Sequence, residues 1–264
     1  MLIIGERINA SRKSIAEAIA SRDALFLQNE AKAQALAGAH YLDVNAGTFA
    51  GEEAKHLQWV IETVQEACDL PLCIDSPDPA VIEAMMPLVK RTPIINSITL
   101  EPSRLDAILP LAAEHKTKLI ALCQSADATA ESAKAKIDMA AQLVEKVNKA
   151  GIPLDDLYID PLVYPIATND VSGLATLDAI EAIMKQFPGV HTICGLTNIS
   201  YGLPRRSLIN RTFLVAAIVR GMDAVIADPT DKQLFGALKS ALLLMGKDEF
   251  ATDYISAFRQ GRLE

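Results

Sequence analysis

The sequence predicts an α/β fold, a (β/α)8 TIM barrel, on three observations. Short apolar runs alternate with helical patterns along all 264 residues, which favours a parallel sheet covered by helices. Most of these runs end in a polar residue, as in Leu-Cys-Ile-Asp75. Connections from strand to helix are often long, whereas those from helix to strand are short, such as residues 90–92. Long loops on one face are typical of a barrel whose site lies at the carboxyl ends of its strands.

Eight apolar runs are interpreted as buried parallel strands because each is short and bounded by turn residues. In order they are 2–5, 41–45, 72–75, 93–97, 119–123, 157–160, 191–195 and 223–227. Helices are expected between them, at 24–38, 53–68, 79–89, 103–115, 130–150, 177–187, 206–220 and 231–245. The long strand-to-helix loops fall at 46–52, 161–176 and 196–205. With no linker or low-complexity segment, residues 1–264 are expected to form a single domain.

Capping residues support the expected helix ends. Asp78 before Pro79 predicts an N-cap followed by proline at the first helical position. Ser103 and Asp231 are further N-cap candidates. Glycines 38, 151, 189 and 221 fall where helices should end in a left-handed residue. A Rossmann-type open sheet is the alternative fold, but no strand is followed by the G-x-G-x-x-G fingerprint.

Composition disfavours several classes of protein. No apolar run approaches the roughly 20 residues that span a bilayer, and the amino terminus lacks the basic region of a signal peptide. A net charge of −8 disfavours nucleic-acid binding, which needs clustered lysine and arginine. The four cysteines contain no C-x-x-C pair, so we expect a protein of the reducing cytoplasm.

Polar strand ends form the candidate site. Asp75, Asn96 and Asp160 each follow an apolar strand, so their side chains are expected to converge in the barrel mouth. A carboxylate accepts two N–H bonds in one plane, and an asparagine can accept and donate together. The set suits a flat heterocycle with a 2-amino-pyrimidinone edge, such as a pterin. The plainer interpretation is that each aspartate caps the following helix.

The stretch 195–206 after the seventh strand is the least regular polar segment of the chain. As a functional element it would direct the Asn198 side chain at the ligand and use Arg206 for an anionic tail. As a structural element it would be a glycine-containing turn.

Other chemistries fit the sequence less well. A carboxylate metal site usually recruits histidine, and none of histidines 40, 56, 115 and 191 follows a strand. A glycosidase would stack its sugar on aromatic residues, but Trp59 is the one tryptophan of the chain and lies in an expected helix. No G-x-S-x-G elbow is present, and no strand ends in a lysine that could form a Schiff base.

Seven segments carry a resemblance to a known family. They are Leu-Ile-Ile-Gly-Glu-Arg-Ile-Asn from residue 2, Leu-Asp-Val-Asn from 42, Cys-Ile-Asp-Ser from 73, Ile-Ile-Asn-Ser from 94, Asp-Leu-Tyr-Ile-Asp-Pro-Leu from 156, Gly-Leu-Thr-Asn-Ile-Ser from 195 and Leu-Ile-Asn-Arg-Thr-Phe from 208. In these segments, over essentially its whole length, the chain resembles the methyltetrahydrofolate:corrinoid methyltransferases of the pterin-binding TIM-barrel group. That group also holds the folate domain of cobalamin-dependent methionine synthase and, more distantly, dihydropteroate synthase.

The resemblance implies roles for seven residues. Pterin contacts match Asp75, Asn96 and Asp160, and Asn198 matches the asparagine that swings in to hydrogen-bond N5 of methyltetrahydrofolate. Further pocket positions are Glu6, Asp43 and Arg206. Two residues depart from the family pattern, since Tyr201 stands at a usual glutamine and Thr197 at a usual serine.

The implied activity moves a methyl group between N5 of tetrahydrofolate and the cobalt of a corrinoid. The chain has no D-x-H-x-x-G cobalamin segment, so a separate corrinoid protein is the expected partner, and a homodimer is implied by resemblance alone. No metal is expected to bind this chain. Both an acetogenic enzyme and the second methyltransferase of a demethylase system fit. The alternatives are a dihydropteroate synthase, whose N-x-T-P-D-S-F loop is missing, and a non-catalytic folate-binding protein.

Overall fold

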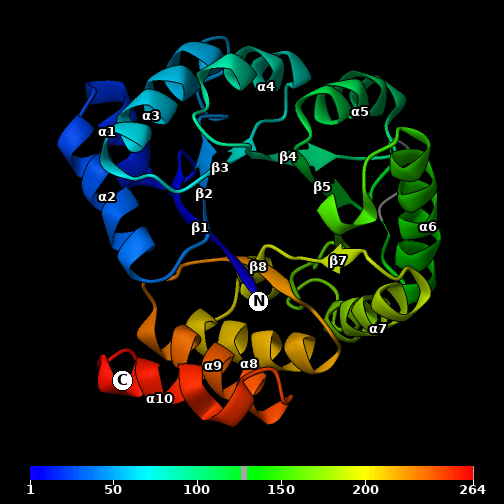
Figure 1. The fold of residues 1–264 in the computed structure, drawn as a ribbon. Coiled ribbons are helices and arrows are strands. Elements are labelled where there is room, and N and C mark those ends of the chain that lie inside the picture. Colours follow the sequence, from blue (N-terminus) through cyan, green and yellow to red (C-terminus); the bar gives the residue numbers. More distant parts are fainter. Residues whose placement is uncertain (126–129, 264) are drawn as a thin grey trace.

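The computed structural model describes residues 1–125 and 130–263. Its eight parallel strands pair in the order β7-β6-β5-β4-β3-β2-β1-β8, and they curve into a barrel surrounded by helices (Figure 1). The strands are β1 (Leu2–Asn9), β2 (Tyr41–Asn45), β3 (Leu72–Asp75), β4 (Ile94–Ile98), β5 (Lys118–Leu122), β6 (Leu157–Asp160), β7 (His191–Thr192) and β8 (Ala224–Ala227). The predicted TIM barrel is therefore confirmed.

The barrel closes between β7 and β8 through very few contacts. Gly195 forms an isolated parallel bridge with Ile226, and the Ile226 amide donates to the Cys194 carbonyl over 3.0 Å. The sequence predicts a strand over 191–195, but β7 spans only two residues. The apolar run after Thr192 remains buried without completing a ladder, so apolarity alone overestimates the strand.

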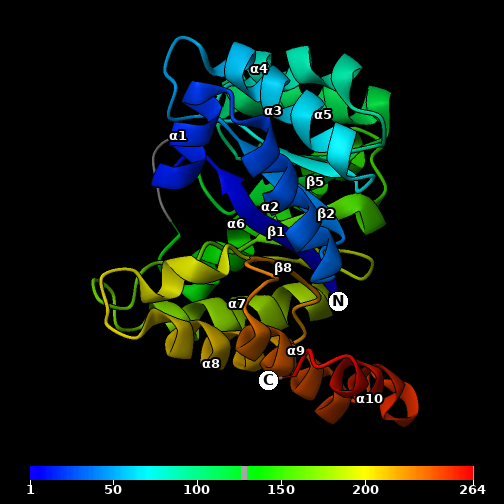
Figure 2. The ribbon, with the colours of Figure 1, turned by 90° about the vertical axis from the view of Figure 1, so that its left-hand side faces the viewer.

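All eight predicted helices are present, and the described residues form two more, one before and one after them. The helices are α1 (Lys13–Ser21), α2 (Ala24–Leu36), α3 (Glu53–Ala67), α4 (Pro79–Met85), α5 (Pro102–His115), α6 (Ala133–Lys149), α7 (Ser172–Gln186), α8 (Arg206–Val219), α9 (Lys232–Leu244) and α10 (Thr252–Arg259). The two that were not predicted are α1 and α10, and Figure 2 shows α10 beside α9. Short 3-10 turns are η1 (Met86–Leu88), η2 (Leu154–Asp156), η3 (Leu196–Ser200) and η4 (Glu249–Ala251).

Most of the predicted caps are found. The Asp78 carboxylate accepts from the Ala80 amide over 2.9 Å, and Asp231 accepts from the Leu234 amide over 3.0 Å. The Ser103 prediction is wrong, because α5 begins one residue earlier at Pro102. Proline suits the first helical position, where its missing N–H would have no partner in any case. The four predicted helix-ending glycines all have positive φ values.

A layer of apolar side chains fills the barrel interior below the candidate site. This cluster takes residues from most of the strands: Ile4, Cys73, Ile94, Ile120, Tyr158, Ile193 and Ala224. A larger core lies between the barrel and its helices. Within the described ranges, no helix is long and apolar enough to cross a membrane.

Candidate active site

The pleat of the strands sets the polar side chains above the interior layer. Side chains two residues apart along a strand point to the same face. Four predicted site residues, Glu6, Asp75, Asn96 and Asp160, lie two positions after Ile4, Cys73, Ile94 and Tyr158 of the interior cluster. Strand period and strand end together therefore bring these polar groups to the carboxyl end of the barrel interior.

A cavity of about 900 Å³ opens at this end of the barrel. Six of the seven predicted site residues line it: Glu6, Asp43, Asp75, Asn96, Asn198 and Arg206. Arg12, Tyr201, Asn210 and Asp228 line it as well. Its volume suits a cofactor-sized ligand.

Neighbouring strands pair the polar groups of one wall. In the register of β2, β3 and β4, Asn45 lies beside Asp75, and Asp75 lies beside Asn96. The side-chain amide of Asn45 donates to the Asp75 carboxylate over 3.0 Å. The side-chain amide of Asn96 donates to the Asp43 carboxylate over 3.5 Å. The peptide bond between Asn96 and Ser97 is cis. This wall therefore presents two carboxyl groups and the Asn96 carboxamide to the cavity, and the Asn45 side chain bonds to one of those carboxyl groups.

Burial disfavours charge on the carboxyl groups. It raises the pKa of Asp75 to about 6, although the Asn45 hydrogen bond and Arg104 oppose the shift. It raises the pKa of Asp43 well above its usual range, and the nearby Asp75 adds to this. Burial also raises the pKa of Glu6, despite its ion pair with Arg12. Ligand N–H groups that donate to such a buried carboxyl group would favour its ionised form.

Asp160 is the one predicted site residue that does not line this cavity. It is buried, and its carboxylate accepts from the Leu162 amide over 2.7 Å. Burial raises its pKa to about 6, while hydrogen bonds from the Leu162 and Gly195 amides and the charge of Lys136 act in the opposite direction. Asp160 thus lies in the same interior as the other carboxyls, but backbone donors already occupy part of its hydrogen-bonding capacity.

Asn198 lies on η3, the turn between β7 and α8. Its amide donates to the Gly195 carbonyl over 3.3 Å, and its side chain is exposed. Its side-chain nitrogen lies 3.6 Å from the position that a Cβ atom at Gly195 would take. Hydrogen bonds to the Asn198 carboxamide are absent among the described residues, so this group is free to bond a ligand.

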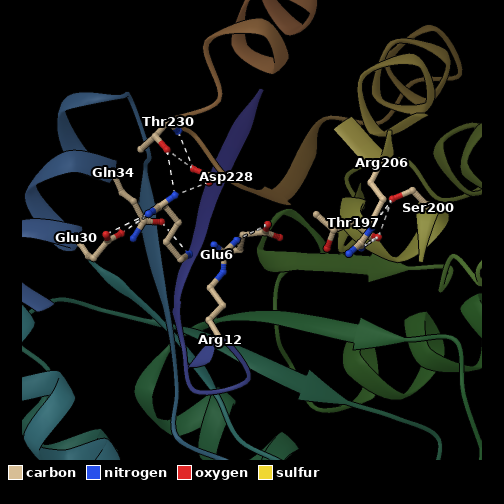
Figure 3. A network of polar contacts seen from close by, with 10 residues as sticks. Glu6, Arg12, Glu30, Gln34, Thr197, Ser200, Arg206, Asp228 and Thr230 are labelled. Atoms are coloured by element: carbon tan, nitrogen blue, oxygen red, sulfur yellow. Dashed lines mark hydrogen bonds and ion pairs between the residues drawn. The ribbon is translucent and has the colours of Figure 1, made fainter. Parts of the chain in front are cut away.

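Arg206 holds the turn that carries Asn198. Its guanidinium donates to the Thr197 carbonyl over 2.7 Å and to the Ser200 hydroxyl over 3.1 Å, as Figure 3 shows. The guanidinium carbon also lies 5.7 Å from the centre of the exposed Tyr201 ring. Arg206 therefore anchors η3 in addition to lining the cavity.

A second group of contacts lies where β1 and β8 meet (Figure 3). Arg7 pairs with Glu30 of α2 over 2.6 Å and with Asp228 over 2.8 Å. Burial acts to raise the pKa of Asp228, but hydrogen bonds from Thr230 and Arg7 outweigh it and lower that pKa. Glu6 pairs with Arg12 over 3.2 Å. Asp228 consequently stays ionised at the cavity edge.

Three polar residues near the site were not among the predicted site residues. Asn45 and Asp228 show the same strand-end pattern as Asp75, but no role in the site was predicted for them. Arg104 of α5 had no such signal. Its guanidinium donates to the carbonyl of Ser97, near the end of β4, at 2.6 Å and to that of Ser76, just after β3, at 2.8 Å.

The part of the chain that the structure describes contains no group of three or more histidine, cysteine, aspartate or glutamate side chains placed to hold a metal ion.

The chain is similar in sequence to known enzymes and similar in fold to solved structures. The profile of the pterin binding enzyme family matches residues 5–228. A methylcorrinoid:tetrahydrofolate methyltransferase of Eubacterium limosum is 37% identical over 265 residues, covering 100% of this chain and 98% of that protein. Methionine synthase of Mycobacterium tuberculosis is 30% identical over 239 residues, covering 86% of this chain but 20% of its own length.

Similar solved structures are dihydropteroate synthases. The Yersinia pestis enzyme superposes with a TM-score of 0.69 at 16% identity, with 93% of each chain covered. The Xanthomonas albilineans enzyme with 4-aminobenzoic acid gives 0.68 at 20% identity, with 93% of this chain and 91% of that chain covered. At these identities the likeness shows the fold alone.

Proposed function

This chain belongs to the pterin-binding enzyme family, and on that premise we propose that it moves a methyl group between N5 of tetrahydrofolate and the cobalt of a protein-bound corrinoid. The observation that carries the proposal is the full-length match to a methylcorrinoid:tetrahydrofolate methyltransferase. The cavity supports it, since the Asp43 and Asp75 side chains that line it carry oxygen atoms able to accept the N–H groups of a pterin edge.

The pterin is proposed to bind with its 2-amino-pyrimidinone edge at Asp75, Asn96 and Asp160. Asp75 and Asn96 come from adjacent strands and face one cavity. Asp43 lies behind Asn96 at 3.5 Å and orients its carboxamide. Asp160 would complete the set from β6, accepting ligand N–H groups at the carboxylate positions that the backbone amide of Leu162 leaves free. Charge-assisted hydrogen bonds of this type are about twice as strong as neutral ones.

Asn198 is the proposed catalytic residue. When the methyl group leaves N5, the electron pair of the N–C bond remains on nitrogen, and N5 takes up a proton. A carboxamide N–H that donates to N5 stabilises this developing charge more than it stabilises bound methyltetrahydrofolate, and only that difference accelerates the transfer. The exposed Asn198 carboxamide, which has no described partner, can move to N5 without breaking a hydrogen bond.

The corrinoid supplies the cobalt that receives or gives the methyl group, and it is proposed to arrive on a separate protein. Exposed Tyr201 and Arg206 at the cavity mouth are available to contact it or the folate tail.

We also propose that residues 1–264 act as one domain. A homodimer is proposed as well. An apolar groove of about 520 Å³ between α7 and α8, lined by Leu174, Leu208 and Phe213, supports it. Metal independence and a cytoplasmic location stay predictions.

Single-turnover methyl transfer tests the proposal. The chain is mixed with tetrahydrofolate and a purified methylcorrinoid protein, and the cobalt absorbance change is followed. Asn198→Ala should lower the saturated rate by roughly 10²–10³-fold, the effect of removing a comparable preorganised donor. Folate affinity should fall much less. Both directions of transfer should slow equally, because they share one transition state.

Asn148→Ala is the matched control, since Asn148 is an exposed residue near the end of α6. It should transfer methyl groups at the wild-type rate. A wild-type protein that binds no tetrahydrofolate and transfers no methyl group would refute the function. A loss confined to folate affinity would refute the role of Asn198 alone.

A further inference from the structure

Lys136 of α6 is fully buried, with an exposed fraction of 0%. Its ammonium donates to the Pro161 carbonyl over 2.6 Å and to the Leu162 carbonyl over 2.5 Å. It also lies 4.9 Å from the centre of the Tyr164 ring. Its described hydrogen bonds thus go to backbone carbonyls. A lysine is seldom buried in this way, because removing an ammonium from water is costly unless it is well bonded.

The carbonyls that Lys136 binds belong to the turn that holds Asp160. The Leu162 amide donates to the Asp160 carboxylate over 2.7 Å. Leu162 has a φ of 55°, in the left-handed region that a residue with a side chain rarely adopts. Two hydrogen bonds from a charged donor, at residues 161 and 162, stabilise this conformation. The contacts therefore run from Lys136 through the backbone to the carboxylate.

Electrostatics adds a direct link between the two side chains. Burial lowers the pKa of Lys136 to about 8, while Cys123, Asp160 and Glu131 act to raise it. Burial keeps the Cys123 thiol uncharged by raising its pKa. The charge of Lys136 in turn lowers the pKa of Asp160, against the effect of burial. The ammonium thus favours an ionised carboxylate near neutral pH.

We propose that Lys136 is a positioning residue for substrate recognition: it fixes the backbone of residues 161 and 162 and so holds the Asp160 carboxylate ionised and oriented in the barrel interior. The ligand that Asp160 then receives is one with paired N–H donors, such as a pterin. Only this last clause rests on the proposed function. The link between Lys136 and Asp160 can be tested without any folate.

Carboxyl ¹³C NMR tests the link in the free protein. The Asp160 resonance is identified by its loss in Asp160→Asn. In Lys136→Met the Asp160 carboxyl should titrate at a clearly higher pH than in the wild type, because a nearby positive charge is gone. Lys134→Met is the control. It removes the same charge from the same helix, but its side chain is 83% exposed, so the Asp160 titration should not move.

Tetrahydrofolate binding by calorimetry tests the consequence. At pH 7, Lys136→Met should weaken binding by about tenfold, as expected for loss of a charge-assisted contact, and the acid limb of the affinity profile should move to higher pH. Lys134→Met should bind as the wild type does. Loss of affinity with an unchanged pH profile would mean a merely structural role and would overturn the proposal, as would an unchanged Asp160 titration.

If Lys136→Met does not fold, titration of backbone amides in the wild-type protein tests the link between Lys136 and the turn that holds Asp160. The Leu162 and Val163 amides adjoin the two carbonyls that Lys136 binds, so their ¹⁵N shifts should titrate together with the Lys136 amine, near pH 8. Amides that stay constant while that amine titrates would overturn the proposal. If no variant and no wild-type sample binds tetrahydrofolate, the proposed function fails, whereas these titrations still decide the link.

Discussion

Asp75 has a pKa of about 6, against an ordinary value of 3.8, because burial disfavours its charged form. Between these two pH values the folded chain binds more protons at this site than the unfolded chain does. Its stability contribution is therefore greatest in acid and is lost as the pH rises through about 6. At neutral pH, without ligand, the Asp75 charge destabilises the fold. Ligand N–H groups would offset that cost.

The first prediction follows for Asp75→Asn. At pH 7 the amide should raise the free energy of unfolding by about 1–3 kcal/mol, since a destabilising buried charge is removed. At pH 4 the gain should nearly vanish, because folded Asp75 is already protonated there. Tetrahydrofolate affinity should fall at pH 7, where the ligand loses a charged acceptor. Urea denaturation at both pH values and calorimetry measure these effects.

Asp106→Asn provides the control for net charge. Asp106 is exposed on α5, so its substitution should change stability little at either pH. A loss of stability in Asp75→Asn at pH 7 would contradict the argument, because the carboxylate would then be a net stabiliser of the free fold.

At the scale of elements, a helix can order the loops of neighbouring strands. Arg104 on α5 donates to the carbonyls of Ser97 at 2.6 Å, Pro77 at 2.5 Å and Ser76 at 2.8 Å. These carbonyls follow directly after Asp75 and Asn96. Burial lowers the pKa of Arg104, yet arginine remains charged at any pH of interest. One side chain thus fixes two loops relative to each other.

Arg104→Met should therefore reduce both stability and folate affinity. Three carbonyls lose a charged donor, and we expect a cost of about 2–4 kcal/mol in the free energy of unfolding. Affinity should fall through a higher dissociation constant, and its acid limb should move to higher pH, because Arg104 no longer lowers the pKa of Asp75. Arg91→Met is the control, because Arg91 bonds only an exposed aspartate, Asp69, and such surface pairs contribute little. Equal stabilities of the two variants would argue against the prediction.

The strand and helix pattern was predictable because barrel strands are short, apolar and regularly spaced. Two helices were missed for local reasons. Glu6 and Arg7 interrupt the apolar run of β1, which continues to Asn9, so the nine residues of α1 were left in an apparent loop. α10 has only eight residues and follows the last strand–helix unit.

The candidate site was predictable to a similar extent. A polar residue after an apolar strand is visible in the sequence, and that signal identified Asp75 and Asn96. Arg104 and Lys136 were not predictable, because they lie within helices and act on backbone carbonyls far away in sequence. No residue pattern marks a carbonyl that needs a donor. Only the packed structure shows these contacts.

At the scale of the whole molecule, side chains reinforce the closure of the barrel where β7 and β8 begin. His191 pairs with Asp223 over 2.6 Å, and the Thr192 amide donates to the same carboxylate over 3.1 Å. The Tyr158 ring stacks on His191 with centroids 4.7 Å apart. The hydrogen bond that the His191 ring donates to the Asp223 carboxylate raises the pKa of His191, although burial opposes it.

A raised histidine pKa stabilises the fold below the unfolded value and ceases to do so as the pH rises through the folded value. The stability difference between the wild type and His191→Gln should therefore be largest on the acid side, near pH 5.5, and should shrink by pH 8. Urea denaturation at several pH values measures it. A pH-independent difference at position 191 would refute the pair as a charge interaction.

The single bridge between Gly195 and Ile226 also has a consequence for motion. Elsewhere each strand is held by a ladder, whose opening requires several hydrogen bonds to break together. Here the opening of one bridge separates the start of η3 from β8 while the rest of the barrel stays folded. Local opening should accordingly be far more frequent at this seam than global unfolding. The segment that carries Asn198 can thus change position far more often than the barrel unfolds.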